Sequence, residues 1–341
     1  MAENSPTSRI LENDALFTNI QENTKHSETL AFATEPVLAS LANILGYLED
    51  RLPQNLPNSV REYKFLDIEI KYGLLQVTEA LTFFHYSCKL IHRNLCPQSV
   101  IINKRGTWKL AGLEFAERCN ESDLMSPVPC QPFTSKLPKM GQPDLDFTAP
   151  EVQATSTCSP LSDMFSLGML ICAVFNNGRP LIDANHSTTN YNKQLELYMK
   201  MSGDDRKDNR LRSCAMYQLE NNIQDLMEKV PHHLQEPLQS LLQTDPWKRP
   251  NAQNFSMIKY FSDPSVHALQ YLDVIQMKDT THKSHFYHSL KASLPGIPKV
   301  RHSLLFFSLL IFPSFDVNEV TISGVREFAS LTQRESHFDE T

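Results

Sequence analysis

The stretch from Leu161 to Phe175 reads LSDMFSLGMLICAVF and is apolar on nearly every side of a helix. A helix without a polar face is stable only when protein surrounds it, so the stretch predicts a helix at the centre of a large domain. The chain has 341 residues, which is enough to build such a core. Hydrophobic residues make up 41% and charged residues 21%, the composition of a globular rather than a disordered chain.

A second helical pattern covers residues 64–86. Leu74, Val77, Leu81 and Phe84 recur at spacings of three and four, so they lie on one helix face. His85 follows this face and is expected to pack in the core.

Two short apolar runs predict a β-hairpin after that helix. Residues 100–102 (VII) and 108–110 (WKL) flank the sequence NKRG, in which Gly106 supplies the positive φ that a tight turn needs. Residues 116–148 are rich in Pro, Ser, Asp and Lys and predict a long surface loop. Between residues 222 and 271 we expect short helices broken at Pro231, Pro246 and Pro264. The expected fold class is therefore α+β, with helices predominating.

Charge and cysteine usage narrow the class of partner and compartment. The net charge of −7 provides no overall basic field for nucleic acid or an anionic membrane. The seven cysteines are scattered without a CxxC pair, which favours a reducing compartment over a disulfide framework or zinc ribbon. The polar N-terminus leads us to expect a cytosolic protein. The apolar run 303–312 is about half the ~20 residues that a membrane-spanning helix needs, so we expect no transmembrane segment.

Five segments in order resemble the motifs of protein kinases. HRNLCPQS (92–99) resembles the catalytic loop H-R-D-L-K-P-x-N, and KLAGLEF (109–115) falls where kinases carry K-L-x-D-F-G. TAPE (148–151) contains the A-P-E motif, SDMFSLG (162–168) resembles D-x-W-S-x-G, and DPWKRP (245–250) resembles the segment whose Arg pairs with the A-P-E Glu. Each motif is weak alone, but five at suitable spacing predict a kinase-like domain.

The four positions that would carry chemistry, in the first two of these motifs, are all changed. Phosphoryl transfer needs a carboxylate to orient and deprotonate the substrate hydroxyl, and an Asp and an Asn to hold Mg²⁺. This chain has Asn94 in place of the base, Cys96 in place of the loop Lys, Ser99 in place of the Asn and Gly112 in place of the metal-binding Asp. We therefore predict no catalytic residue and no metal site, and expect the protein not to be an enzyme.

The segment before the hinge is equally changed. LAFATEP (30–36) resembles the hinge strand, yet the first glycine of the chain is Gly46, so no Gly-rich phosphate loop precedes it. Lys25 is the only earlier lysine and lies in a polar stretch. The resemblance thus implies a small lobe truncated before the hinge strand. Only the analogy of fold would argue for ATP binding, so we predict no cofactor.

The positions that would hold the fold together are kept. The resemblance implies that Asp163 bonds the backbone of the catalytic loop, that Glu151 and Arg249 form a buried ion pair, and that His92 packs beneath the site. Arg93 either caps nearby carbonyl groups or binds a phosphate on the following loop. That loop contains four hydroxyl residues: Ser122, Ser126, Thr134 and Ser135.

The sequences of several segments are similar to those of the Scy-like pseudokinases, in particular the branch associated with clathrin-coated vesicles. FLDIEIKYGLLQVTEAL, LIHRNLCPQSVIINKRGTWKLAGLEF, SLGMLICAVFNNGRP and LPGIPKV carry this similarity. It predicts a polar segment at 1–27, a kinase-like domain at 28–265, a helical extension at 266–300 and a divergent tail at 301–341. The family implies a non-catalytic scaffold in vesicle traffic between endosomes and the trans-Golgi. Clathrin or adaptor partners, and a cytoplasmic location with peripheral attachment to those membranes, follow from it.

Two other functions remain open from the residues. A weak kinase would use Asp144, Asp146 or another carboxylate in place of the lost ones, and a truncated product would have no independent role. Cys96 is either a reactive thiol or, as we expect, an inert buried one. His282, His285 and His288 share a helical spacing, for which we expect a solvated or partner-facing helix rather than a metal site.

Overall fold

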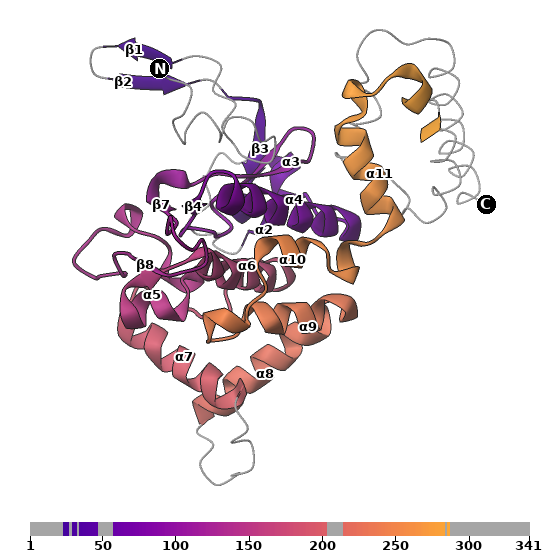
Figure 1. Ribbon diagram of the computed structural model, residues 1–341. Helices are drawn as coiled ribbons and strands as arrows, with labels where there is room; N and C mark the ends of the chain where they lie inside the picture. Colours follow the sequence, from indigo (N-terminus) through magenta and orange to yellow (C-terminus); the bar gives the residue numbers. More distant parts are fainter. Residues whose placement is uncertain are drawn as a thin grey trace. The chain divides into compact units, whose positions relative to one another are not determined.

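The computed structural model describes residues 23–26, 29–32, 34–46, 57–202, 214–283 and 285–286 (Figure 1). They form two compact units. The first unit contains the residues up to 64 together with 74–103 and 108–258, and the second contains 65–73, 104–107 and the residues from 259 onward. The apolar run 303–312 and the predicted tail 301–341 lie outside the described residues. Many helices with sheets of two or three strands give the α+β class that the sequence predicts.

Helix α6 (Pro160–Phe175) is the centre of the first unit, which confirms the prediction from its all-round apolarity (Figure 1). Every residue from position 160 to 174 is buried. Ser159 caps the N-terminus reciprocally with Ser162, and Pro160 occupies the first turn, where its missing N–H costs nothing. A Cβ on Gly168 would lie 2.9 Å from Cδ2 of Leu242, so glycine lets the end of α9 (His232–Leu241) approach α6 closely.

Several of the other helices in the first unit contact α6. The helix predicted over residues 64–86 is α4, and its Leu74, Val77, Leu81 and Phe84 are fully buried as expected. The others are short or amphipathic, and Pro231 and Pro246 lie at helix starts as predicted. Their bounds are as follows: α2 (Leu41–Leu45), α3 (Asn58–Arg61), α4 (Asp67–Tyr86), α5 (Pro150–Thr155), α7 (Thr188–Ser202), α8 (Cys214–Lys229), α9 (His232–Leu241), η7 (Pro246–Lys248) and α10 (Ala252–Ser256).

The predicted hairpin forms the core of a three-stranded sheet. β5 (Val100–Asn103) pairs antiparallel with β6 (Trp108–Leu110), and Gly106 in the turn has φ 82°. β3 (Val37–Ser40) adds to the other edge of β5. Three two-stranded pairs complete the described strands: β1 (Asn23–His26) with β2 (Thr29–Phe32), β4 (Leu90–Ile91) with β7 (Glu117–Arg118), and β8 (Val128–Pro129) with β9 (Thr157–Cys158).

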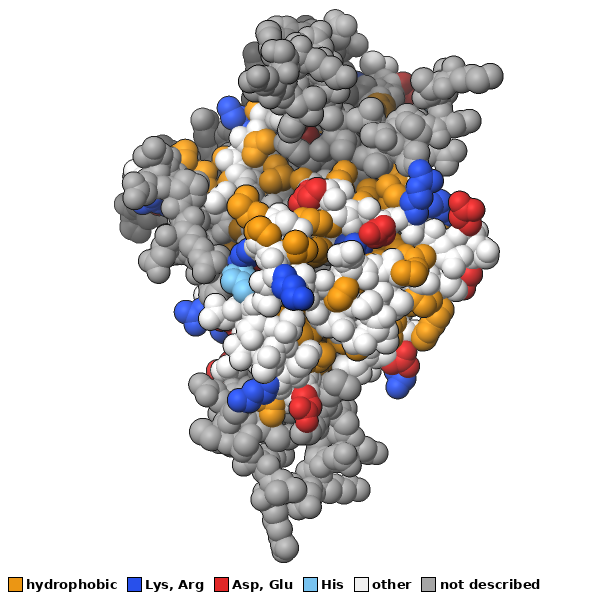
Figure 2. All heavy atoms as spheres, turned by 90° about the vertical axis from the view of Figure 1, so that its left-hand side faces the viewer, with side chains coloured by type: hydrophobic (Ala, Val, Ile, Leu, Met, Phe, Trp, Pro, Cys, Tyr) orange, Lys and Arg blue, Asp and Glu red, His pale blue; other side chains and the backbone are white. Residues whose placement is uncertain are grey.

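Residues 116–148 form the long loop that their composition predicts, interrupted only by short elements. These are β7, β8, η3 (Lys139–Gly141) and η4 (Leu145–Phe147), with η2 (Leu113–Phe115) just before them. The buried amide of Gln142 fixes part of this loop, because it bonds both backbone groups of Thr134 and the carbonyl of Leu137. On the face drawn in Figure 2, acidic and basic side chains of the described residues are interspersed rather than gathered by sign.

The second unit contains η8 (Lys259–Phe261), α11 (Pro264–Asp273), η9 (Ile275–Met277) and the first residues of α4. Pro264 begins α11, as predicted, behind the N-cap Asp263. Lys71 lies 2.6 Å from the carboxylate of Asp263 and over the ring of Tyr260. None of the helices within the described ranges is long and apolar enough to cross a membrane.

Candidate functional site

The carboxylate of Asp163, in the first turn of α6, holds the loop that follows β4. Its oxygens accept the backbone N–H groups of His92 at 2.7 Å and Arg93 at 2.8 Å. Nε2 of His85, near the end of α4, lies 2.8 Å from the same carboxylate. Burial opposes ionisation of Asp163, but the hydrogen bond from His85 and the neighbouring His92 hold its pKa below the ordinary value. Asp163 therefore joins two helices and the loop.

His92 has no nitrogen left for proton transfer. Its Nε2 lies 2.7 Å from the carbonyl oxygen of Ala111 and therefore donates, while Nδ1 accepts from the backbone N–H of Asn94 at 3.2 Å. Its ring packs against the ring of Phe84 with centroids 5.9 Å apart. Burial lowers the pKa of His92 and so favours the neutral ring. The side chain thus positions backbone and is unsuited to act as a general base.

Three of the four changed positions lie against one another. A Cβ on Gly112, which has φ 74°, would lie 2.9 Å from Cβ of Ser99 and 3.5 Å from Nδ2 of Asn94. Oδ1 of Asn94 accepts the backbone N–H of Asp144 at 3.2 Å, and its Nδ2 lies 3.4 Å from Glu114. Ser99 Oγ both accepts from and donates to the backbone of residue 96. The polar atoms at these positions are already used in holding the loops.

Cys96, the fourth changed position, is a buried thiol rather than a reactive one. Its side chain lies inside the loop with 3% of its surface exposed. Burial, followed by the nearby charge of Asp144, raises its pKa to about 12. Because the thiolate is the nucleophilic form, Cys96 is inert at neutral pH.

Arg93 uses its guanidinium on two groups of the following loop. Nη2 donates to the carbonyl oxygen of Gln131 at 2.7 Å, and Nη1 lies 3.0 Å from the carboxylate of Glu117. The capping of a carbonyl group is thus the arrangement present. Arg93 itself has φ 67°, a left-handed conformation that the two backbone bonds to Asp163 help to fix.

Glu151 and Arg249 form a two-pronged ion pair. Nη1 and Nη2 of Arg249 lie 2.7 and 2.9 Å from the two carboxylate oxygens of Glu151. The remaining donors of the guanidinium bond the carbonyl oxygens of Leu161, Gln243 and Thr244. This arrangement leaves no guanidinium N–H for a ligand.

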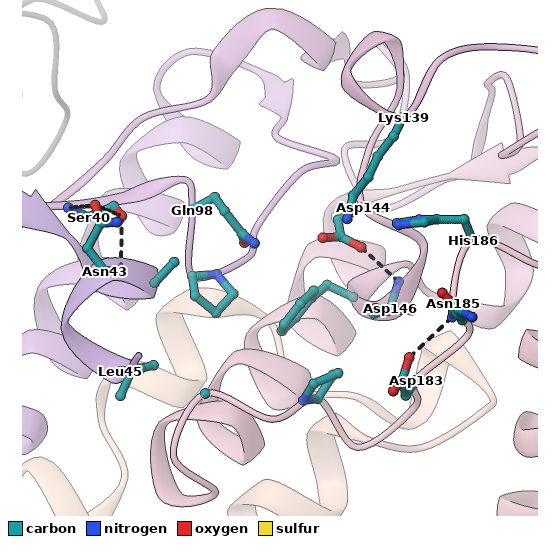
Figure 3. A pocket seen from close by; sticks show the side chains of 15 residues that line it. Ser40, Asn43, Leu45, Gln98, Lys139, Asp144, Asp146, Asp183, Asn185 and His186 are labelled. Carbon is teal, nitrogen blue, oxygen red and sulfur yellow. Dashed lines mark hydrogen bonds between the residues drawn. The ribbon is translucent and has the colours of Figure 1, made fainter. Parts of the chain in front are cut away.

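A cavity of about 670 Å³ opens beside the loop that follows β4, and several polar side chains line it (Figure 3). Asp144, Asp146 and Asp183 lie on one side of it, and Ser40 and Asn43 lie on the other (Figure 3). The other lining residues are Ala42, Leu45, Pro97, Gln98, Lys139, Phe147, Gly178, Pro180, Asn185 and His186. Three carboxylates against a single lysine make the cavity acidic.

Asp146 is the most perturbed of these carboxylates. Burial, and then the charge of Asp144, raise its pKa to about 7. Its Oδ1 accepts the backbone N–H of Ala184 at 2.8 Å, and its own N–H donates to Asp144. A protonated fraction of Asp146 is therefore present at neutral pH.

We expect Asp146→Asn to stabilise the protein at high pH but not at low pH. The folded pKa lies above the unfolded value near 3.9, so between about pH 4 and 7 the folded state holds a proton that the unfolded chain releases. Wild-type stability then falls with rising pH by up to about 1.4 kcal/mol per pH unit. The amide of the variant does not titrate, so its stability lacks this dependence on pH. Its carbonyl oxygen can still accept the backbone N–H of Ala184. Urea unfolding at pH 5, 6 and 8 measures the difference.

The exposed Asp183→Asn serves as the matched control, since it removes a carboxylate from the same cavity without a buried charge. A stability difference between Asp146→Asn and wild type that stays constant from pH 5 to 8 would contradict the raised pKa.

The sequence does not predict the place of some residues in this region. His85 was expected only to pack, yet it is a bonded partner of Asp163, far along the chain. Asp183 lines the cavity from the loop after α6 without belonging to a motif. Within the described residues no three metal-ligating side chains form a cluster, and His282 instead pairs with Asp279. His288 lies outside the described residues.

The sequence model for the protein kinase domain matches residues 22–261. The chain belongs to the protein kinase family. Within this family it is similar to the Scy-like proteins. SCY1-like protein 2 of mouse is 37% identical over 273 residues, which is 80% of this chain and 27% of the mouse protein, and the human protein gives the same figures. The protein kinase-like protein SCY1 of Saccharomyces cerevisiae is 26% identical over 304 residues, or 88% of this chain and 35% of the yeast protein.

A Dictyostelium discoideum relative, named a probable inactive serine/threonine-protein kinase, is 22% identical over 251 residues, or 72% of this chain and 25% of that protein. The similarity to Scy-like proteins that the sequence suggested is thus confirmed, and the kinase-like fold with it. The chain spans about a quarter to a third of the length of these relatives. The domain boundaries predicted at residues 28, 265 and 300 stay a prediction.

Proposed function

We propose that the chain is a catalytically inactive kinase-like module, a pseudokinase that acts as a scaffold or adaptor by binding other proteins. The observation that supports this most is that Asn94 and Ser99 both lie close to Gly112. Phosphoryl transfer would require a base and two metal ligands at these positions. An amide, a hydroxyl and a glycine are present instead.

The residues at this site do not fit Mg²⁺ and nucleotide phosphates. Mg²⁺ takes oxygen ligands in near-octahedral geometry and is usually bound through one or two carboxylates. The oxygen of Asn94 accepts a backbone N–H, that of Ser99 is bonded within its own loop, and Gly112 has no side chain. The proposed function therefore includes no step through a metal or ATP.

The proposed setting is clathrin-dependent traffic between endosomes and the trans-Golgi, in the cytoplasm or at the surface of those membranes. Its support is the similarity to SCY1-like protein 2 and the family that the sequence resembles. The acidic cavity would suit a partner segment that carries Lys or Arg, because a cleft lined by one sign of charge concentrates the opposite sign. Binding of the purified chain to purified clathrin and adaptor proteins, measured by calorimetry, tests this setting separately from catalysis.

A weak kinase is the second candidate. It is favoured by Asp146, whose pKa of about 7 suits a general base and whose side chain lines the cavity. Against it, both Asp144 and Asp146 already accept backbone N–H groups. Phosphate release from ATP that disappears in Asp146→Asn would establish this candidate. The third possibility, a truncated product without a role, requires the purified chain to show no cooperative unfolding.

We expect that restoring the lost residues does not restore activity. In the triple variant N94D/S99N/G112D, the aspartate introduced at position 112 must adopt φ 74°, with its Cβ 2.9 Å from Cβ of residue 99. Strain of this kind costs about 1–3 kcal/mol. We therefore expect a loss of stability, phosphoryl transfer below detection, and no shift of Tm with Mg·ATP in the variant or the wild type.

The control is Gly112→Ala, which adds the same backbone strain without a carboxylate and should lose a similar stability. A nucleotide at 100 times its Kd would stabilise the fold by about 2.7 kcal/mol, which a thermal melt detects easily. A Mg²⁺-dependent rise of the wild-type Tm with ATP would overturn the inactive assignment.

A further inference from the structure

The cavity beside the loop that follows β4 has two unlike walls. Asp144 and Asp146, from the N-cap and first turn of η4, and Asp183, from the loop after α6, lie on one side and form what we call the charged wall (Figure 3). On the opposite side, Ser40 and Asn43 bond each other and cap α2. The side chains that line the cavity from α2 are neutral, so the negative charge comes from one side only.

The cavity has room for several residues of a partner chain. Its volume of about 670 Å³ lies within the range of about 300–1,000 Å³ that is typical of ligand sites. Leu45, Phe147 and Pro180 give it an apolar lining, against which the aliphatic stem of a long cationic side chain can pack. The exposed amide of Gln98 lies between the two walls and offers a donor and an acceptor to a peptide backbone (Figure 3).

The negative charge of the charged wall is only partly balanced within the cavity. Lys139 is the only Lys or Arg among the described residues that line it. Burial, then Asp144 and less strongly Asp183, raise the pKa of Asp146 to about 7, and Lys139 offsets this only in part. A further cation beside Asp146 would favour its ionised form and would be attracted by the charge that results.

We propose that this cavity binds an extended segment of a partner protein through an arginine or lysine of that segment. The cation of the partner lies against Asp144 and Asp146, and its aliphatic stem lies on Phe147. Asp183 is placed to attract a second basic residue of the same segment. A segment rich in Asp or Glu is disfavoured by repulsion. The inference rests on the proposed scaffold function and names the chemistry of the segment that the scaffold holds.

The test is a selection from a synthetic library of randomised nonapeptides on the purified, immobilised full chain at pH 8. We expect Arg or Lys to be enriched at one or two positions of the selected peptides. Titration calorimetry then measures the affinity of the strongest peptide. D144N/D183N should bind it roughly ten- to hundred-fold more weakly, because charged contacts are lost. Both amides keep an acceptor for the backbone N–H groups that the carboxylates bond, so this variant should fold normally.

Two further variants control for charge and for folding. D225N/E228Q removes two exposed carboxylates from α8, outside the cavity, and should leave the affinity for the peptide unchanged. Lys139→Gln removes the lysine of the cavity and should tighten binding about two- to five-fold, a gain that a destabilised fold would not produce.

Three results would each overturn the proposal. The first is a set of selected peptides without enrichment of Arg or Lys, and the second is equal binding by D144N/D183N and the wild type. The third is binding of spermine in the cavity as tightly as the best peptide, which would assign the cavity to small polyamines. None of them contradicts the scaffold function itself, because clathrin and adaptor binding and the melts with Mg·ATP test that function separately.

The pH dependence of peptide binding gives a second readout. Only ionised Asp146 attracts the cation, so an arginine peptide should bind about ten-fold more weakly at pH 6 than at pH 8. A histidine gains positive charge as the pH falls over this range, so His186, which also lines the cavity, acts in the same direction. In Asp146→Asn only the part due to His186 should remain. A wild-type affinity that is the same at pH 6 and pH 8 would overturn the placement of the cation at Asp146.

Discussion

Replacing Asp163 by Ala is expected to destabilise the fold by about 3–5 kcal/mol, a large part of the stability of an ordinary domain. The carboxylate is fully buried and is bonded to the backbone N–H groups of His92 and Arg93 and to the ring of His85. Its removal leaves these buried donors without their acceptor, and each unsatisfied group costs about 1–3 kcal/mol. Urea unfolding monitored by circular dichroism measures the change.

The matched control is Asp225→Ala, an exposed carboxylate on α8, for which we expect a change within about 0.5 kcal/mol. The pH dependence offers a second check. Because the folded pKa of Asp163 lies below its unfolded value, its contribution is present above about pH 4 and is lost as the pH falls through the folded pKa. An Asp163→Ala variant as stable as wild type at pH 7 would show that the loop after β4 is held by other contacts.

The parts of the fold that the sequence predicts are those with a local or periodic signal. The all-round apolar helix at 160–175 and the one-sided helix at 67–86 follow from spacing alone, since each pattern allows only one way to bury its residues. The hairpin follows from two apolar runs around Gly106. The kinase-like motifs add the order of these elements, because their spacing is characteristic of one family.

The contacts that the sequence does not predict join positions that no pattern relates. His85 and Asp163 lie on different helices. From the sequence alone, core packing would explain His85, and a favourable charge at the N-terminus of a helix would explain Asp163. The cavity combines carboxylates from two separate loops, so its acidity is visible only once the chain is folded.

The pattern of what is kept and what is lost bears on the scaffold proposal. Asp163 and Arg249 each form several hydrogen bonds to the backbone. The side-chain oxygens of Asn94 and Ser99 also accept backbone N–H groups. Bonds of this kind hold the loops in one arrangement, and a preformed surface favours the binding of a partner over chemistry.

The second large effect is expected for Arg249→Met, with a loss of about 3–5 kcal/mol. Methionine keeps much of the length of the side chain but leaves Glu151 without its cation and three carbonyl oxygens without their donor. The guanidinium also lies 5.0 Å from the ring centroid of Phe165, a contact that is lost as well. Denaturant unfolding at pH 7 measures the loss.

Three further variants test whether the two-pronged geometry of Arg249 or its charge alone stabilises the fold. Arg249→Lys keeps the charge but cannot make the two-pronged contact, so we expect it to recover only a minor part of the loss. Glu151→Gln combined with Arg249→Met should cost less than the sum of the single changes, by about 1–3 kcal/mol, because no buried charge is then left alone. The exposed neighbour Lys248→Met should change little. Additive single changes would show that Glu151 and Arg249 stabilise the fold independently, because the pairing itself would then contribute nothing.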